Sequence, residues 1–344
     1  MFLWLKLLVS FFVPYSEKML ANNNMNKERI DWEKLSPREI KAEFAKINRK
    51  FVERYELIDD SDQFYSYLAK PIRTSIRINT LKIDPGCVLR RLKDKIDKEI
   101  PWFEFGFFVK DKEIGKTIEH KLGLIFLQEA ASMIPPVVLD PKPGSKVLDI
   151  AAAPGAKTTQ IAQLMQNDGC IIANDVKVDR VNILISNLQK CGVLIAKVTL
   201  KDGRFFGRFE NKFDYVLIDA PCSNVGMIRK NFKYLKIWSM RDVKALSRLQ
   251  KELLLAGYKS LRPGGTLVYS TCTLDPLENE EVVNFLLEKT NAELEEIDIK
   301  VKSRRPFTKF EGKEYFKEIK KCLRIHPQDN DTEGFFIAKI VKNY

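Results

Sequence analysis

Residues 144–159 read GSKVLDIAAAPGAKTT, in which an apolar run ends at Asp149 and small residues lead into a polar segment. Four further apolar runs follow, separated by stretches with helical periodicity. Strands that alternate with helices predict an α/β fold with a parallel, doubly wound sheet. The predicted strands are 146–150, 170–174, 194–199, 213–219 and 266–270, with a turn at Pro263-Gly264-Gly265 and a closing strand at 334–341.

Residues 27–121 form a separate block ahead of this sheet. A serine-proline pair at 36–37 predicts the start of a helix that continues to about residue 55. Residues 75–81 alternate polar and apolar side chains, as a half-buried strand does, and a second helix is predicted over 85–96. We therefore expect a smaller α+β domain at 27–121 and a larger domain at 122–344.

The first 26 residues contain a strongly apolar run at 1–13. This run is too short to span a bilayer, and it lacks the small-residue cleavage site of a secretory signal peptide. Met19 and Met25 follow in a polar stretch. Our hypothesis is that translation starts at Met19 or Met25 rather than Met1, so that part or all of the extension 1–26 is not translated.

The composition indicates a globular protein with an affinity for polyanions. The chain contains 58 Lys and Arg residues and 46 Asp and Glu residues, which gives a formal net charge of +12. A surface with an excess of positive charge attracts nucleic acid. Residues 229–251 carry eight basic side chains against one acid, and 300–324 carry ten against three. Phe232, Tyr234 and Trp238 lie in the first of these segments, where they either stack on bases or pack in the core.

Six scattered cysteines without CxxC spacing, and only two histidines, predict neither a zinc site nor a disulfide framework. We therefore expect no metal, no membrane association and a reducing, cytoplasmic location. Four of the cysteines are interpreted as small buried hydrophobes: Cys87, Cys170, Cys191 and Cys322.

A cofactor site is predicted at the carboxyl ends of the strands, where residues 151–158 turn into a helix with its N-terminal amides facing the crevice. A P-loop is excluded because it requires glycines at 151 and 156, and both are alanine. Asp175 ends the second strand, at the place from which an acid binds ribose hydroxyls. Asp202 follows the third strand and either accepts from an adenine amino group or builds a turn. The spacing leaves NAD and S-adenosylmethionine both open.

Two cysteines follow the fourth and fifth strands, in the segments DAPCS at 219–223 and STCT at 270–273. Cys222 and Cys272 should therefore project into the same crevice as the cofactor. The cofactor would then be surrounded by two thiols, a carboxylate at Asp219 and an amine at Lys157. This set of groups fits nucleophilic addition to an electron-poor ring, with a thiolate as the attacking form.

The chain resembles the Nol/Nop/Sun (Fmu-type) family of RNA cytosine-5 methyltransferases, which use S-adenosylmethionine. Two cysteine motifs in this order, each after its own strand, are highly specific to that family. The resemblance implies a Rossmann-like, doubly wound methyltransferase sheet and an N-terminal domain that contacts RNA. The matching segments are IRINTLK at 76–82, QEAAS at 128–132, AAAPGAKTT at 151–159, Asp175 with Arg180, Asp202, DAPCS at 219–223, YSTCT at 269–273 and TEGFFIAKI at 332–340.

The resemblance also implies roles for the catalytic residues. Cys272 attacks C6 of the cytosine while Asp219 bonds the base near N3, so that C5 becomes the methyl acceptor. Cys222 then helps to remove the C5 proton and to release the enzyme, and Lys157 helps to hold the base. DNA cytosine methyltransferases attack from a Pro-Cys motif, so the chemistry alone would leave Cys222 and Cys272 interchangeable; the resemblance selects Cys272. A duplex blocks C6, so the target base must be unpaired or flipped out.

By the same resemblance, residues 151–157 hold the methionine part of the cofactor, Asp175 its ribose and Asp202 its adenine. Ala156 replaces the usual second glycine of PGGK, and Asn224 replaces a glycine after DAPCS. Asn tolerates left-handed conformations, and neither change removes a chemical group, so we expect activity. The predicted cofactor-binding residues are Ala151, Ala152, Ala153, Pro154, Gly155, Ala156, Lys157, Asp175, Arg180, Asp202 and Asp219.

The sequence therefore predicts a monomeric methyltransferase that acts on cytidine C5 of a structured RNA, with tRNA favoured over ribosomal RNA. One alternative is a non-catalytic RNA-binding protein on the same fold, which the presence of all four catalytic candidates disfavours. The other is a small-molecule methyltransferase, which would explain neither the two cysteine motifs nor the basic segments.

Overall fold

The computed structural model describes residues 30–343. Contacts within the chain divide it into two units, Met1–Leu35 and Ser36–Tyr344, and the account below concerns the second. The predicted extension at 1–26, with its alternative starts at Met19 and Met25, lies outside the described residues. Within residues 30–343, no helix combines the length and apolar character that crossing a bilayer requires.

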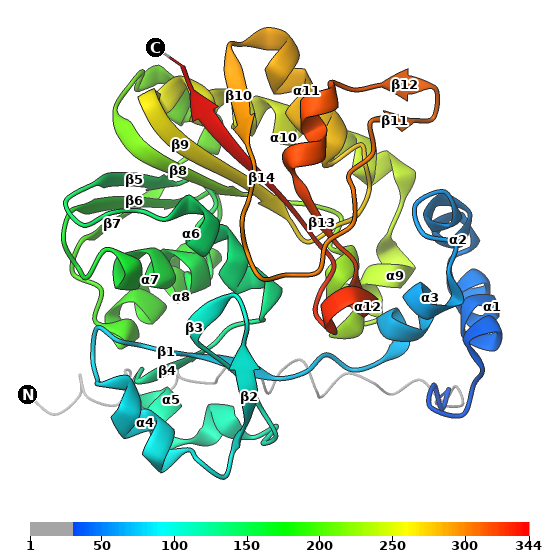
Figure 1. Cartoon of the computed structure of the whole chain (residues 1–344), viewed down its shortest axis with the longest axis horizontal. Helices are drawn as coiled ribbons and strands as arrows, with labels where there is room; N and C mark the ends of the chain where they lie inside the picture. Colours follow the sequence, from blue (N-terminus) through cyan, green and yellow to red (C-terminus); the bar gives the residue numbers. More distant parts are fainter. Residues whose placement is uncertain (1–29, 344) are drawn as a thin grey trace, which may run out of the picture. The chain divides into compact units, whose positions relative to one another are not determined.

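A large mixed sheet lies at the centre of the Ser36–Tyr344 unit (Figure 1). Strands β5 to β9 run parallel, while β14 pairs antiparallel with β9, β10 and β13. The predicted doubly wound sheet is thus confirmed, and the predicted closing strand is the antiparallel β14. In spatial order the strands are β10 (Ala292–Glu295), β14 (Phe335–Lys342), β9 (Leu261–Thr271), β8 (Phe213–Asp219), β5 (Lys146–Asp149), β6 (Cys170–Asp175) and β7 (Ala196–Leu200), with β13 (Leu323–Ile325) beside β14.

Helices cover both faces of this sheet (Figure 1). One face is covered by α6 (Ile134–Leu139), α7 (Ala156–Leu164) and α8 (Val178–Cys191), and the other by α10 (Met240–Ser260) and α11 (Glu280–Lys289). Val147, Leu217 and Val268 are completely buried between these layers. Strands that are buried on both faces read as continuous apolar runs, which is why the sequence revealed them so clearly.

Strand β9 begins five residues earlier than predicted, and the predicted turn at Pro263-Gly264-Gly265 lies inside it. Its register with β8 shifts at this point: Phe213 lies opposite Leu261, but Tyr215 lies opposite Thr266. The extra residues on β9 form a bulge, and Gly264 has a φ of 71°, which a side chain would disfavour. The turn residues therefore distort the strand instead of preceding it.

A second, antiparallel sheet has the order β2-β3-β1-β4. The predicted helix over 85–96 is wrong beyond Arg91, because residues 96–100 form β2 and pair with β3. Strand β4 extends this sheet beyond residue 121. The domain limits 27–121 and 122–344 remain a prediction. The elements are β1 (Ser75–Ile78), α4 (Pro85–Arg91), β2 (Ile96–Ile100), β3 (Phe103–Val109), η1 (Ile114–Lys116), α5 (Ile118–Lys121), β4 (Ile125–Leu127) and η2 (Ala131–Met133).

Arg77 of β1 attaches the small sheet to α7. Its guanidinium is fully buried and donates to Gln128 Oε1 at 2.9 Å, to Thr159 Oγ1 at 2.6 Å and to Gln163. These partners are neutral, and burial lowers the pKa of Arg77 to about 10. The small sheet is thereby held against the helix that starts at the cofactor turn.

Three helices, α1 (Pro37–Ile47), α2 (Arg49–Glu56) and α3 (Asp62–Ala69), precede the small sheet. The predicted single helix to residue 55 is wrong because Asn48 interrupts it with extended backbone. The Asn48 side chain accepts from Phe51 N at 3.1 Å and donates to the carbonyls of Leu235 and Trp238, both at 2.9 Å. A tertiary contact thus decides where the first helix ends.

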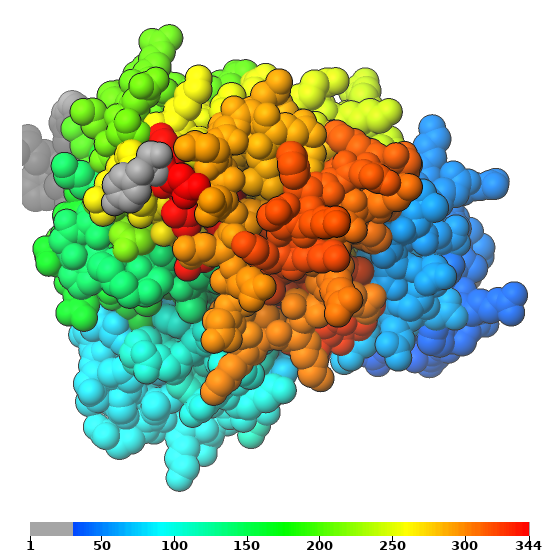
Figure 2. All heavy atoms as spheres, turned by 45° about the horizontal axis from the view of Figure 1, so that its top comes forward, coloured from blue at the N-terminus to red at the C-terminus, as the bar shows by residue number. Residues whose placement is uncertain are grey.

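The segment between β10 and β14 lies beside these N-terminal helices, as the orange and blue surfaces of Figure 2 show. Glu311 of this segment pairs with Arg54 of α2 at 2.6 Å, and Arg304 pairs with Asp59 at 2.8 Å. Arg54 also forms a buried ion pair with Asp275, which follows β9, at 2.7 Å. The remaining elements are η3 (Gly203–Arg208), η4 (Val225–Arg229), α9 (Lys233–Ile237), β11 (Lys309–Phe310), β12 (Lys313–Glu314), η5 (Lys317–Lys321) and α12 (Pro327–Asn330).

Candidate active site

A cavity of about 630 Å³ opens at the carboxyl ends of the parallel strands. Strand β5 comes first in sequence among the strands of the large sheet, and it has β6 on one side and β8 on the other. The cavity therefore lies at the point where the strand order reverses. The residues that line it are Ile150, Ala151, Asn174, Asp175, Val176, Lys177, Arg180, Asp202, Gly203, Arg204, Asp219, Ala220, Pro221, Cys222, Asn224, Leu246, Leu249, Leu253 and Cys272.

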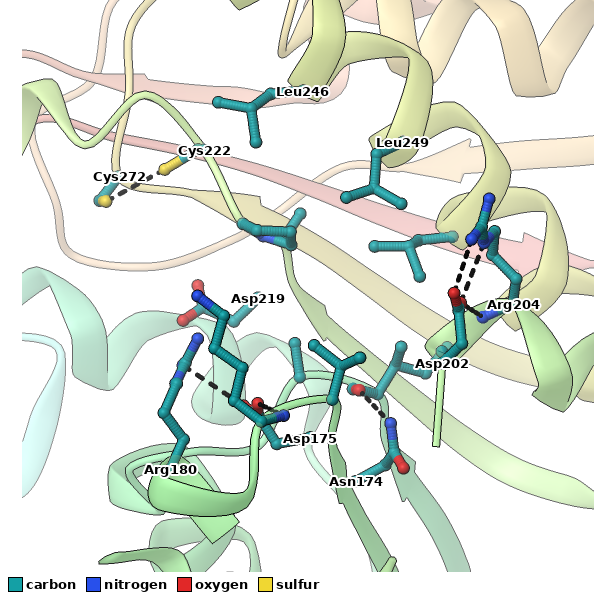
Figure 3. Close-up of a pocket in the computed structure, with 18 of the residues that line it drawn as sticks. Asn174, Asp175, Arg180, Asp202, Arg204, Asp219, Cys222, Leu246, Leu249 and Cys272 are labelled. Carbon is teal, nitrogen blue, oxygen red and sulfur yellow. Dashed lines mark hydrogen bonds and ion pairs between the residues drawn. The ribbon is translucent and has the colours of Figure 1, made fainter. Parts of the chain in front are cut away.

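Figure 3 shows how the predicted site residues share this cavity. Cys222 and Cys272 lie at one end, Asp202 and Arg204 at the other, and Asp219 and Asp175 between them. Of the predicted cofactor-binding residues, 152–157 are not among those that line the cavity; they form the turn beside it.

The turn after β5 depends on Gly155. This residue has a φ of 103°, and a Cβ atom there would lie 3.0 Å from Leu184 Cδ1. Ala156, the departure from the usual second glycine, is the first residue of α7 and has helical backbone. A side chain costs nothing in that conformation, so the substitution is compatible with the turn.

Asp175 at the end of β6 is buried, with 2% of its surface exposed. Its Oδ1 accepts from Lys177 N at 3.1 Å, and Arg180 lies 3.4 Å from Oδ2. Oδ2 finds no hydrogen-bond donor within residues 30–343. A buried carboxylate oxygen that accepts no hydrogen bond from the protein can accept one from a ligand, so Asp175 is placed to bind hydroxyl groups.

Asp202 builds a turn, as one of the two predicted alternatives requires, and it also lines the cavity. It caps η3 by accepting from Arg204 N at 2.9 Å and pairs with the Arg204 side chain at 2.6 Å. Sequence reasoning missed Arg204 and the apolar wall that Leu246, Leu249 and Leu253 of α10 contribute. These leucines share one helical face, a pattern that any core-facing helix shows, so the sequence held no specific signal for them.

Lys157 and Asp219, predicted from separate motifs, form an ion pair of 2.7 Å. Lys157 Nζ also donates to Ser132 Oγ at 2.9 Å, and Ser270 Oγ donates to the second oxygen of Asp219 at 2.9 Å. Both charged groups are therefore held in place beside the cysteines. Ser132 and Ser270 lie in segments that the resemblance included, but their part in this network was not predicted.

The two cysteine thiols meet at an Sγ to Sγ distance of 3.2 Å. Asn224 Oδ1 lies 3.6 Å from Cys272 Sγ and 4.0 Å from Cys222 Sγ, and its backbone is left-handed with a φ of 59°, as expected for Asn at this position. The hydrogen bond with Cys222 and burial raise the pKa of Cys272 well above its ordinary value. Cys272 is therefore a thiol in this state and must lose its proton before it can attack.

The two cysteine loops are tied together. Ser223 and Thr273 share a hydroxyl hydrogen bond of 2.9 Å, and Gly226 N donates to Cys272 O at 2.8 Å. Glu278 anchors the first loop by accepting from Ser223 N at 3.0 Å. It is completely buried, and this burial raises its pKa to about 7.

Replacing Glu278 with Gln should remove a pH-dependent part of the stability. A carboxyl whose pKa is raised by folding stabilises the folded state at low pH, and this contribution is lost as the pH rises to 7. From pH 4.5 to 7.5 the free energy of unfolding of the wild type, relative to Glu278→Gln, should fall by about 3 kcal/mol. Urea unfolding at both pH values measures this difference. The exposed Glu293→Gln serves as the control, and an equal difference at both pH values would contradict the prediction.

The other four cysteines are free, like the two in the site. Cys191 and Cys322 are buried as predicted. The prediction is wrong for Cys170, which is exposed at the first position of β6, and Cys87 is half-buried. In the described part of the chain, no group of three or more His, Cys, Asp or Glu side chains is arranged to hold a metal ion.

Comparison with known proteins places the chain in a family. Residues 136–341 match the profile described as 16S rRNA methyltransferase RsmB/F, and residues 47–130 match the N-terminal domain of 16S rRNA methyltransferase RsmF. The chain belongs to the RsmB/F methyltransferase family. The predicted family, methyltransferase class and Rossmann-like fold are thereby confirmed.

Individual relatives of this RsmB/F methyltransferase act on different RNAs, according to their names. The tRNA (cytosine(49)-C(5))-methyltransferase of Pyrococcus abyssi is 61% identical over 306 residues, which cover 88% of this chain and 98% of that protein. Ribosomal RNA small subunit methyltransferase F of a Shewanella species is 42% identical over 294 residues, which cover 82% of this chain but only 59% of that protein. A solved structure, NSun6 from Pyrococcus horikoshii with SFG, has a TM-score of 0.72 and 26% identity, with 90% of this chain and 98% of that chain covered.

Proposed function

We propose that this RsmB/F methyltransferase transfers a methyl group from S-adenosylmethionine to C5 of a cytidine in RNA, with tRNA favoured over ribosomal RNA. The observation that carries the proposal is the pair of thiols of Cys222 and Cys272, 3.2 Å apart at one end of the cavity, next to Asp219. Two thiols at one end of the cavity favour a reaction in which a thiol adds to a pyrimidine over a role in RNA binding alone.

The residues of the cavity fit S-adenosylmethionine. Asp175 offers the ribose hydroxyls its Oδ2, which is ion-paired with Arg180 at 3.4 Å but accepts no hydrogen bond within residues 30–343, and the leucines of α10 offer an apolar wall for adenine. The turn at 151–157 presents backbone amides at the start of α7 to the methionine part. The cofactor supplies an electrophilic methyl group. The structure of NSun6 from Pyrococcus horikoshii, solved with SFG, supports a ligand of this kind for the fold.

In the proposed reaction, the Cys272 thiol first releases its proton to solvent, and its Sγ then forms a bond to C6 of the flipped cytosine. The electrons of the C5–C6 double bond move to C5 and make it nucleophilic. Asp219 bonds the base near N3, and Lys157, which is fixed by Asp219 and Ser132, holds the base in position. Once C5 carries the methyl group, Cys222 acts as the base in its thiolate form, takes the C5 proton and later returns it to solvent. The electrons of the C5–H bond then restore the ring double bond, and the Sγ–C6 bond breaks. Both cysteines are needed because one is bonded to the ring while the other moves the proton.

The basic segment 229–251 supports an RNA substrate, although not all of its charges are available. Arg229 is buried and bonds the carbonyl of Thr332, so it is structural. Trp238 is likewise buried, packed against Phe51 at a ring distance of 5.4 Å. Within residues 229–251, the exposed cations that form no ion pair with residues 30–343 are available to contact phosphates; they are Lys233, Lys236, Lys244 and Arg248.

The preference for tRNA rests on the relatives. The Pyrococcus abyssi protein named for tRNA matches nearly its whole length, while the ribosomal RNA enzyme extends well beyond the matched part. Action as a monomer and a cytoplasmic location belong to the same proposal.

The proposal is tested by transfer of labelled methyl from S-adenosylmethionine to total tRNA and to ribosomal RNA separately, followed by bisulfite sequencing. We expect label in tRNA at a single cytosine. Label in ribosomal RNA alone would overturn the preference for tRNA. If neither RNA accepts methyl while calorimetry shows that the cofactor binds, the chain is an RNA-binding protein on a methyltransferase fold.

Replacing Asp175 with Ala should weaken S-adenosylmethionine binding by roughly 10- to 100-fold, because hydrogen bonds to a buried carboxylate are lost. Isothermal titration calorimetry measures the affinity without RNA. Asp179→Ala, in the exposed first turn of α8, is the matched control and should bind normally. Unchanged affinity in Asp175→Ala would place the ribose elsewhere.

A further inference from the structure

The thiols of Cys222 and Cys272 are close to the geometry of a disulfide. Their sulfurs lie 3.2 Å apart and face each other at one end of the cavity (Figure 3). A disulfide bond is about 2.05 Å long, so the two sulfurs need to approach each other by only about 1 Å to bond. Small rotations about the Cα–Cβ bonds of the two cysteines supply a movement of that size.

The backbone around the two cysteines is already fixed at a short separation. Ser223 and Thr273, each one residue beyond a cysteine, share a hydroxyl hydrogen bond of 2.9 Å. Gly226 N donates to Cys272 O at 2.8 Å, and a Cβ atom on Gly226 would lie 3.0 Å from that oxygen, so the two loops pack there without an intervening side chain. A disulfide therefore requires no further ordering of the two loops, and this removes most of its entropic cost.

A small oxidant can reach both sulfurs through the cavity. Cys272 is half-buried and only 6% of the surface of Cys222 is exposed, but both residues line the cavity. Hydrogen peroxide is far smaller than this space of about 630 Å³. The oxidant therefore reaches the thiols from the same side as a cytosine that enters the site.

The other four cysteines lack this arrangement. All six cysteines belong to residues 30–343, and within that range Cys222 and Cys272 are the pair whose sulfurs are in contact. Cys191 and Cys322 are buried. Cys170 is exposed at the start of β6, where no second thiol is near, so its oxidation cannot be resolved within the molecule.

We propose that Cys222 and Cys272 are a reversible oxidation site, at which hydrogen peroxide converts the two thiols into a disulfide and stops methyl transfer. One thiol attacks the peroxide: an S–O bond forms, the O–O bond breaks, and a sulfenic acid and water result. The other thiol then attacks the sulfenic sulfur, so that the S–S bond forms, the S–O bond breaks and a second water leaves. Two thiols are oxidised, one peroxide is reduced, and the two thiol protons end in water.

The loss of methyl transfer rests on the proposed function, in which Cys272 is the nucleophile and Cys222 the base. The disulfide removes both groups but leaves Asp175 and the leucines of α10 unchanged, so S-adenosylmethionine should still bind. The disulfide also protects Cys272, because a sulfenic acid that reacts with a second thiol does not proceed to the irreversible sulfinic acid. A dithiol reductant restores both thiols by thiol–disulfide exchange and is itself oxidised to a disulfide.

The test treats the full chain with hydrogen peroxide at pH 8.5, without RNA or cofactor. Remaining thiols are blocked with N-ethylmaleimide, and peptides are mapped by mass spectrometry without reduction. We expect a Cys222–Cys272 cross-linked peptide as the main product. Methyl transfer to tRNA should fall by at least about tenfold and recover with dithiothreitol, while calorimetry shows that S-adenosylmethionine still binds. Cys170→Ala is the matched control and should form the same cross-link.

The variant Cys222→Ala removes the second thiol, so peroxide should convert Cys272 into a sulfinic acid that dithiothreitol does not reverse. Sulfinic acid on Cys272 of the wild type, or cross-links that join other cysteines or two molecules instead, would overturn the inference. A cross-linked enzyme that methylates tRNA as fast as the reduced enzyme would overturn it as well. The cross-link is detected by mass on the wild-type chain and needs neither a variant nor activity, so a failure of the proposed methylation is distinguishable from a failure of this inference.

Discussion

Replacement of Cys272 by Ala should abolish methyl transfer to RNA, with residual activity lower by roughly 10⁴-fold or more. The thiol of Cys272 supplies the bond to C6 that makes C5 a nucleophile, and within the described residues Cys222 is the other thiol at this end of the cavity. A missing nucleophile cannot be compensated by the intact pair of Lys157 and Asp219. The measurement is single-turnover transfer of labelled methyl to tRNA.

Cofactor binding provides the check that Cys272→Ala is folded, because Asp175 and the α10 leucines are untouched. Cys170→Ala is the matched control, since Cys170 is an exposed cysteine at the start of β6, the end of the strand away from the cavity. If Cys272→Ala retains activity and Cys222→Ala loses it, the two cysteines exchange roles, as the Pro-Cys motif of DNA cytosine methyltransferases allows.

Replacement of Cys222 by Ala should instead trap a covalent complex between the protein and its RNA. Attack by Cys272 and methylation of C5 proceed, but the C5 proton stays in place, so the Sγ–C6 bond does not break. The 3.2 Å separation of the two sulfurs puts Cys222 next to the ring atoms that Cys272 engages. We expect at least about half of the enzyme to become attached to RNA in the presence of S-adenosylmethionine, against a trace in the wild type.

Denaturing gel electrophoresis with labelled tRNA detects this adduct directly. The double variant Cys222→Ala with Cys272→Ala should give none, which assigns the bond to Cys272. Product released freely by Cys222→Ala would refute the role given to Cys222, and release from this variant would then require another base in the site.

Some of the fold was readable because its strands are buried on both faces. β5, β6, β8, β9 and β14 are largely apolar runs, whereas the edge strand β7 reads AKVTL and has no buried residue. All six strands were predicted to within five residues of their observed limits. In contrast, β2 reads IDKEI, which shows no strand pattern. β10 reads AELE and alternates buried and exposed residues, but over four residues only, which is too short to be recognised in a sequence. These strands exist because β3 and β14 offer them backbone partners. The break at Asn48 similarly depends on carbonyls nearly 190 residues away.

The sequence by itself determined the family and the presence of the parallel strands, and it predicted Lys157, Asp219, Cys222 and Cys272 as site residues, since each belongs to a local motif that follows a strand. Only the tertiary structure decided that the two thiols touch and that Lys157 is bonded to Asp219. The physical reason is that local motifs record what each chain segment does, whereas the electrostatic environment of a buried thiol is the sum of charges from segments far apart in sequence.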